Sequence, residues 1–408
     1  MTTGNRRMPR SMALLADRDI RSMALARFAA ILGASALPTA LAFSVLSIKG
    51  VSPSALGIVV ASAVVGQVVC LLPGGVVADR MSRRLVMIVA ELVVGAVSLL
   101  SGSLVISGHA TVATLAVLAA IGGGAGGFFY PAFTGFVPQV AQPEVLQSVN
   151  ALLRLSVNIA RILGTAVGGL IVAVIGPGAA IGSAGIAALI AAAFVAMVRP
   201  RFVVARQGDS NPFRDFRDGW RTFTSRTWVV AVVVAGTLSN IGASAAMGVL
   251  GPLQSVASLN GASSWAVITS TLALGTVIGA LMAGRVRTRR PLVLAMIALG
   301  LFSLPMIALA RPMSMAVIVI AALVAGISLD LFSVLWDTAL QKNIPNDSLS
   351  RVSAFDWLGS FALSPIALAV AGPLVNAYGI STVLYIAAAF AATPPLALLV
   401  PAVRRLRA

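Results

Sequence analysis

Ionisable and polar side chains lie inside long apolar runs of this sequence, where they could bind a polar solute or carry a proton. Within the run 145–175 they are separated by four, four, three and four positions: Asn150, Arg154, Asn158, Arg161 and Thr165. At about 100° per residue, these five share one helix face. Such a stripe cannot face lipid, so we expect it to line a substrate path or to form ion pairs between helices. The ion pair is favoured for Arg154, and both interpretations stay open for Arg161.

Acidic residues in the same surroundings are candidates for reversible proton transfer. Asp330 lies nearest the middle of its apolar run, where a carboxyl can be wet in one conformation and dry in another. We therefore expect Asp330 to carry a coupling proton, with Glu91 as the next candidate; the alternative for each is a fixed structural role. Asp356, nearer the inner end of its run, is expected at a gate. Arg27 and Asn240, also inside apolar runs, are further candidates for the substrate path.

The sequence offers little material for catalysis or metal binding. It contains one His, His109, and one Cys, Cys70. A zinc site needs several such ligands, and a lone His forms no catalytic cluster. We therefore expect no metal, no cofactor and no enzyme activity. No Walker sequence is present, so we do not expect ATP to act directly.

The elements that must position these residues are membrane-spanning helices. Hydrophobic residues make up 59% of the chain and charged residues 10%, against about 25% charge in soluble domains. A spanning helix needs about 20 apolar residues. Runs of that length cover 21–48, 54–78, 85–107, 110–136, 145–175, 178–198, 227–256, 264–284, 291–310, 313–340, 350–376 and 380–401. They predict an all-α membrane protein of about 12 transmembrane helices in two pseudo-repeated six-helix bundles.

The charges predict how the chain crosses the membrane. The net charge of +17 is carried by short basic clusters between apolar runs, so we expect no nucleic-acid partner. With the N-terminus in the cytoplasm, Lys49 and Arg311 are the basic residues of the outer loops, which satisfies the positive-inside rule. Both termini are then cytoplasmic. The arginine-rich composition favours a bacterial inner membrane.

The longest polar stretch divides the chain into two halves of six helices. The expected organisation is a tail over 1–20, a bundle over 21–198, a linker over 199–226, a bundle over 227–401 and a tail over 402–408. A helix opened by Pro212 would place aromatic residues on one face of the linker: Phe213, Phe216, Trp220 and Phe223. We expect that helix to lie on the inner leaflet, with a flexible basic linker as the alternative.

The two halves repeat one pattern. The segment Gly74-Gly75-Val76-Val77-Ala78-Asp79-Arg80 recurs in weakened form as Gly279-Ala280-Leu281-Met282-Ala283-Gly284-Arg285, and paired arginines follow each copy. A second echo places Val137-Pro138 before Asn150-Ala151 and Ile344-Pro345 before Ser353-Ala354. Equivalent places in the two halves indicate an internal repeat of the kind found in transporters.

The loop Gly75-x-x-x-Asp79-Arg80-x-x-Arg83-Arg84 resembles the signature of the major facilitator superfamily. With twelve runs and the half-repeat, the resemblance covers essentially the whole chain; Ser82 stands where the family pattern usually has Gly. The resemblance implies a conformational gate formed by Gly75, Asp79, Arg80, Arg83, Arg84, Arg351 and Asp356, in which Asp79 contacts the region of Arg351. Phe128-Phe129-Tyr130-Pro131-Ala132 and Gly164-x-x-x-Gly168-Gly169 look like the drug-efflux branch of macrolide and enterobactin exporters.

This resemblance implies a secondary active exporter, an antiporter that couples protons to efflux of a small amphipathic molecule such as a drug, antibiotic or siderophore-like metabolite. The expected partners are that molecule, protons and the lipid bilayer, and the expected working unit is a monomer. An uptake permease of the same fold for a small metabolite is the alternative. A receptor or scaffold that transports nothing is a third, which the charges inside the runs disfavour.

Overall fold

The computed structural model describes residues 16–406, apart from 49, 143–144, 202–216, 218–219, 284, 287, 312, 345–351, 353–354 and 357. Throughout this part the secondary structure is helical, without a strand. Twelve of the described helices are long and apolar enough to cross a membrane. The predicted fold class, an all-α protein of about 12 transmembrane helices, is confirmed.

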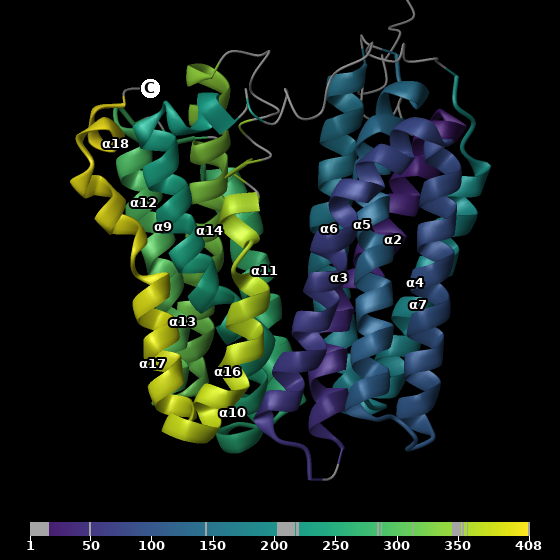
Figure 1. The fold of residues 1–408 in the computed structure, drawn as a ribbon, viewed down its shortest axis with the longest axis horizontal. Helices are drawn as coiled ribbons and strands as arrows, with labels where there is room; N and C mark the ends of the chain where they lie inside the picture. The colour runs from purple at the N-terminus through teal and green to yellow at the C-terminus, as the bar shows by residue number, and fades with distance from the viewer. Residues whose placement is uncertain are drawn as a thin grey trace, which may run out of the picture. The chain divides into compact units, whose positions relative to one another are not determined.

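The chain forms two compact units (Figure 1). The first contains the described residues of Met1–Leu37, Ser62–Ile171 and Ile175–Arg206, and the second contains those of Pro38–Ala61, Val172–Val174 and Gln207–Ala408. The six long helices of the N-terminal half are α2 (Arg18–Leu46), α3 (Pro53–Arg80), α4 (Arg83–Ile106), α5 (Val112–Val140), α6 (Leu146–Val174) and α7 (Pro177–Met197). The end of α2, the start of α3 and the last residues of α6 therefore belong to the second unit.

The helices of the C-terminal half are shorter and more often interrupted. They are α9 (Thr227–Ala245), the π-helix η1 (Ala246–Leu250), α10 (Gly251–Ser258), α11 (Ala262–Ala283), α12 (Pro291–Gly300), the 3-10 helix η2 (Leu301–Ser303), α13 (Leu304–Ala310), α14 (Met315–Asn343), α16 (Ser364–Tyr378), α17 (Ile380–Ala391), the 3-10 helix η3 (Pro394–Leu399) and α18 (Pro401–Arg405). Pro252, Pro305 and Pro365 stand in the first turn after three of the interruptions. Proline lacks the N–H that a continuous helix would use there.

Small residues bring the first unit's helices into backbone contact. A Cβ at Gly123 of α5 would overlap the carbonyl oxygen of Ala63 on α3, and one at Gly66 of α3 would overlap that of Ala120 on α5. Without a hydrophobic driving force between helices in lipid, close backbone packing of this kind holds a bundle together. It fixes α5 relative to α3 and so determines where the α5 side chains point.

Part of the predicted interfacial helix is described. Phe213 and Phe216 lie outside the described residues, but Trp220 and Phe223 belong to a helical turn. Phe223 is only 6% exposed, and its ring centroid lies 5.9 Å from that of Phe355. This end of the linker therefore packs into the core of the second unit.

Candidate transport site

A caged arginine lies in the membrane-spanning part of the first unit. Arg27 comes from α2, and its guanidinium carbon lies 4.5 Å from the ring centroid of Phe133 on α5. The ring centroids of Phe129 and Tyr130 lie 5.7 and 5.9 Å away, and Phe129 stacks on Phe133. A cation over an aromatic face gains about 2 kcal/mol when it is desolvated. The aromatic residues of α5 thus hold a positive charge at a fixed place in the bundle.

An acid faces this arginine from a third helix. Glu91 of α4 is 6% exposed and attracts Arg27 electrostatically. Arg161 of α6 repels Arg27. Among the described residues, none forms a hydrogen bond or ion pair with the Glu91 carboxyl. An acid and an arginine that attract each other inside a membrane bundle, without a direct bond, are candidates for proton exchange or for binding a polar group.

The polar stripe of α6 lies largely at the surface of its unit. Asn150, Arg154, Asn158 and Arg161 are exposed, and Thr165 is half-buried. Arg154 makes no ion pair with any acid in the described part of the chain. The interpretation in which an ion pair locks Arg154 therefore finds no partner there, while the substrate-path interpretation stays a prediction.

A second polar set, which the sequence analysis missed except for Asn240, joins α9 to the broken helix before α16. Thr237 Oγ1 donates to the Gly359 carbonyl at 2.9 Å, and Asn240 Nδ2 donates to the Ser360 carbonyl at 3.1 Å. Ser244 Oγ lies 3.0 Å from Ser364 Oγ. The helix breaks between residues 361 and 364, which frees carbonyls just before the break, and side chains of a neighbouring helix can satisfy such groups in a membrane. The sequence carried a signal for this set, because polar residues at 237, 240 and 244, spaced by three and four, share one helix face.

The described acids of the second unit are already engaged. Trp336 Nε1 donates to Asp356 Oδ2 at 2.9 Å, and Ser360 Oγ lies 3.5 Å from Asp356 Oδ1. The Trp336 ring stacks on Phe332 and meets Trp228 edge-on. Asp330 is half-buried and has an interaction partner of its own. The structure thus places Asp356 within the second unit, in contact with α14.

Two arginines of the predicted gate bond to backbone carbonyls of neighbouring helices in the first unit, and one of them does so near a helix end. Arg83 Nη1 donates to the Gly135 carbonyl at 2.5 Å, and Arg84 donates to the carbonyls of Val195 and Ala196 near the end of α7. Cations near helix C-termini are favoured by the helix dipole. Arg80 is exposed. The Gly75 and Asp79 side chains and all of Arg351 lie outside the described residues, so the contact between Asp79 and Arg351 stays a prediction.

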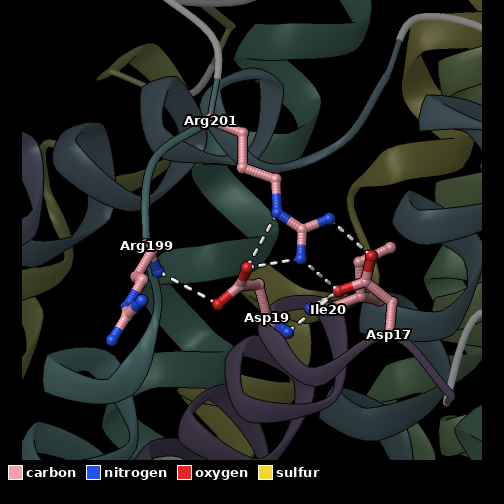
Figure 2. A network of polar contacts seen from close by, with 5 residues as sticks. All are labelled: Asp17, Asp19, Ile20, Arg199 and Arg201. Carbon is pink, nitrogen blue, oxygen red and sulfur yellow. Dashed lines mark hydrogen bonds and ion pairs between the residues drawn. The ribbon is translucent and has the colours of Figure 1, made fainter.

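Polar contacts close the same end of the first unit (Figure 2). Arg201 donates to Asp17 Oδ2 at 2.6 Å and to Asp19 Oδ2 at 2.8 Å, and the Arg199 N–H donates to Asp19 Oδ1 at 3.1 Å. Partial burial alone would raise the pKa of Asp17, but hydrogen bonds from Arg201 and from the backbone of Ile20 and Asp19 hold that pKa below its ordinary value of 3.8. This clasp fixes the segment after α7 to the start of α2.

Twelve helices that could span a membrane and a charged cluster inside a helix bundle are typical of membrane transporters. The chain matches the Major Facilitator Superfamily over residues 23–368 and belongs to that family. It is therefore a secondary transporter that works by alternating access, as its family does. No curated protein sequence matches the chain.

Solved structures share the fold at low identity. The nucleoside transporter NupG is 15% identical with a TM-score of 0.74, covering 93% of this chain and 98% of its own. A D-xylose-proton symporter is 16% identical with a TM-score of 0.68 (93% and 97% covered). A POT family transporter in complex with a thioalcohol-conjugated peptide is 11% identical with a TM-score of 0.70 (95% and 97% covered). None of these three descriptions names a drug or an export direction, so the predicted efflux branch finds no support among them.

Proposed function

We propose that this chain is a proton-coupled uptake permease for a small polar solute, and that Glu91 carries the coupling proton. The observation that carries the proposal is the buried Glu91 carboxyl, which faces Arg27 and has no hydrogen-bond partner in the described part of the chain. Burying a carboxyl inside a membrane bundle costs free energy, so such residues usually mark a functional site. Asp330, which already has a partner, is the second candidate for the same role.

Arg27 gives the proton a use in transport. When Glu91 is ionised, it offsets the charge of Arg27, and when Glu91 is protonated, Arg27 is left without that offset and can attract an electronegative solute group. Protonation and solute binding then favour each other, which is the coupling that a symporter needs. Release of the proton on the other side of the membrane would weaken the hold on the solute.

The aromatic residues favour a solute with a flat or ring-shaped face. Tyr130 is 50% exposed beside the buried Phe129 and Phe133, and an exposed ring can stack on a sugar or a base. The similar structures are described as transporters of nucleosides and of xylose, and one as a proton symporter. These descriptions support uptake over efflux, and we propose nucleosides and pentoses as the first solutes to test.

The charge distribution supports the placement of this permease in the bacterial inner membrane with both termini cytoplasmic. Impermeant labelling of a Cys at Gly208 in a Cys70→Ala background tests the orientation, and labelling from outside the cell would overturn it. The structure of a single chain contains the whole charged cluster, which supports a monomer as the working unit.

Transport into liposomes tests the function. The purified chain is reconstituted with an acidic exterior, and accumulation of labelled nucleosides and pentoses is measured with and without a proton ionophore. We expect wild-type protein to accumulate at least one of them above equilibrium, and Glu91→Gln to equilibrate it without accumulation. Solute expulsion from loaded vesicles placed in an acidic exterior, where protons enter as the solute leaves, would instead favour an antiporting exporter.

A further inference from the structure

A basic hollow opens where the connection from α11 to α12 meets the end of α14, within the second unit. Its volume is about 910 Å³. The polar part of its lining is Thr288, Arg289, Arg290, Thr338, Lys342 and Asn343. Among the described residues no acid lines it, and Asp337, the nearest acid along α14, is not among its walls. The described lining therefore carries three positive charges and no negative one.

These three cations are not used elsewhere in the described part of the chain. The side chains of Arg289, Arg290 and Lys342 are exposed, and they form no hydrogen bond or ion pair with described residues. Two neighbouring arginines differ, because Arg226 donates to the Asn343 carbonyl at 2.7 Å and Arg285 donates to the Leu281 carbonyl at 3.1 Å. Arg226 and Arg285 therefore cap helices, whereas Arg289, Arg290 and Lys342 are available to bind a ligand.

A helix start adds to the positive potential. Helix α12 begins at Pro291, which lines the hollow, and its N-cap residue, Arg290, provides no side-chain cap. Pro291 has no N–H, so the donors of this first turn are the N–H groups of the residues that follow it, which point outward and attract anions. Three cations and an uncapped helix start together match the chemistry of a phosphate group, which accepts several hydrogen bonds and carries negative charge.

The remaining walls indicate that the phosphate belongs to a lipid. Val286, Pro291, Leu335 and Ala339 complete the lining. The last turn of α11, just before the hollow, exposes Leu281 (61%) and Met282 (46%), which offer an apolar surface to acyl chains. Basic pockets beside spanning helices on the cytoplasmic side suit anionic headgroups.

We propose that this hollow binds the phosphate headgroup of an anionic phospholipid of the inner leaflet, with the acyl chains against α11. Arg289, Arg290 and Lys342 neutralise the phosphate, whereas the hydroxyls of Thr288 and Thr338 already bond within the chain, to the Arg290 N–H and the Val334 carbonyl. The choice of leaflet rests on the proposed orientation, but the site itself does not depend on the transported solute.

Native mass spectrometry of the purified full-length chain tests this site with phosphatidylglycerol as the probe and phosphatidylcholine as the neutral comparison. The test variant is Arg289→Gln/Arg290→Gln. The matched control is Arg404→Gln/Arg405→Gln, which removes two exposed charges from α18, a helix that packs against α12 without lining the hollow. Lys342→Gln is a milder second variant in case the double change impairs folding.

We expect the pocket variant to retain about fivefold less phosphatidylglycerol than wild type, and the α18 control to differ by less than about twofold. Phosphatidylcholine retention should be equal in all of them. Equal retention of phosphatidylglycerol by pocket and control variants would overturn the proposal. Displacement of phosphatidylglycerol by millimolar inorganic phosphate would show that the hollow binds a free anion, and would overturn the assignment to a lipid. Because no readout uses transport, this result is independent of the proposed function.

Discussion

The two units handle polar groups inside the membrane in opposite ways. In the first unit, Arg27 is held by aromatic rings and faces Glu91 without direct contact. In the second unit, Thr237 and Asn240 bond to the backbone carbonyls freed by a broken helix. Groups that are already paired act mainly in structure, whereas charges held near each other but unbonded can change state. The difference supports the proposal that proton chemistry belongs to the first unit, and it gives the polar groups of the second unit a role in supporting a broken helix.

The largest effect should come from removing the caged cation. Arg27→Gln leaves the buried Glu91 carboxyl without the positive charge that faces it, and we expect a loss of stability of about 3 kcal/mol, measured by thermal unfolding in detergent. Adding Glu91→Gln should recover most of that loss, because the neutral pair leaves no uncompensated charge. Additive losses in the double variant would mean that the two residues are not coupled.

A smaller effect is expected from the ring nearest Arg27. Phe133→Leu removes the cation–π contact, worth about 2 kcal/mol, and should lower transport as well as stability. Phe136→Leu is the matched control, because Phe136 is a buried phenylalanine of the same helix without a contact to Arg27. Equal transport by the two variants would show that the ring serves packing alone.

In the second unit, Asn240→Leu should lower the free energy of unfolding by about 1 kcal/mol, because the Ser360 carbonyl loses its donor. This is the usual contribution of an interhelical hydrogen bond in a membrane. Pro365→Ala removes the ring that clashes with the Phe361 carbonyl and restores an N–H that can bond to it. The turn at the break can then close as a helix, in which the Ser364 N–H reaches the Ser360 carbonyl. The loss caused by Asn240→Leu should therefore shrink in the Pro365→Ala background. A loss of the same size in both backgrounds would show that the contribution of Asn240 does not depend on the helix break.

The smallest effect concerns the clasp of Asp17, Asp19 and Arg201. Because the folded pKa of Asp17 lies below its ordinary value of 3.8, its ionisation stabilises the fold above that value, and this contribution is lost as the pH falls through the folded pKa. Asp17→Asn should lower the free energy of unfolding by less than about 1 kcal/mol near neutral pH. At a pH where Asp17 is protonated in both the folded and the unfolded state, the substitution should have no effect. A difference that grows on acidification would contradict this sign.

The sequence was sufficient for the fold because lipid imposes simple rules. Long apolar runs have few alternatives to spanning helices, and the signature loop with its repeat identified the family that the comparison confirmed. The α6 stripe was also visible, since helical spacing alone places Asn150 and Arg161 on one face.

The partners of the buried charges could not be predicted in this way. Which acid faces Arg27 depends on how α2, α4 and α5 pack, and that packing depends on glycine contacts such as the one between Gly123 and Ala63. From the sequence alone, Asp330 is favoured because it lies nearest the middle of its apolar run. That criterion takes no account of which side chains neighbouring helices bring close. The sequence likewise showed Pro365 inside an apolar run, but not that Thr237 and Asn240 would bond to the carbonyls before it.

Proton movement driven by the solute itself tests the central claim most directly. Liposomes with a trapped pH dye and no imposed pH gradient receive the transported solute outside, and internal acidification is recorded beside solute exchange. We predict acidification with wild type and with Asp330→Asn, and exchange without acidification with Glu91→Gln. Acidification by Glu91→Gln at the wild-type rate would contradict the account, and its loss in Asp330→Asn alone would transfer the coupling role to the second unit.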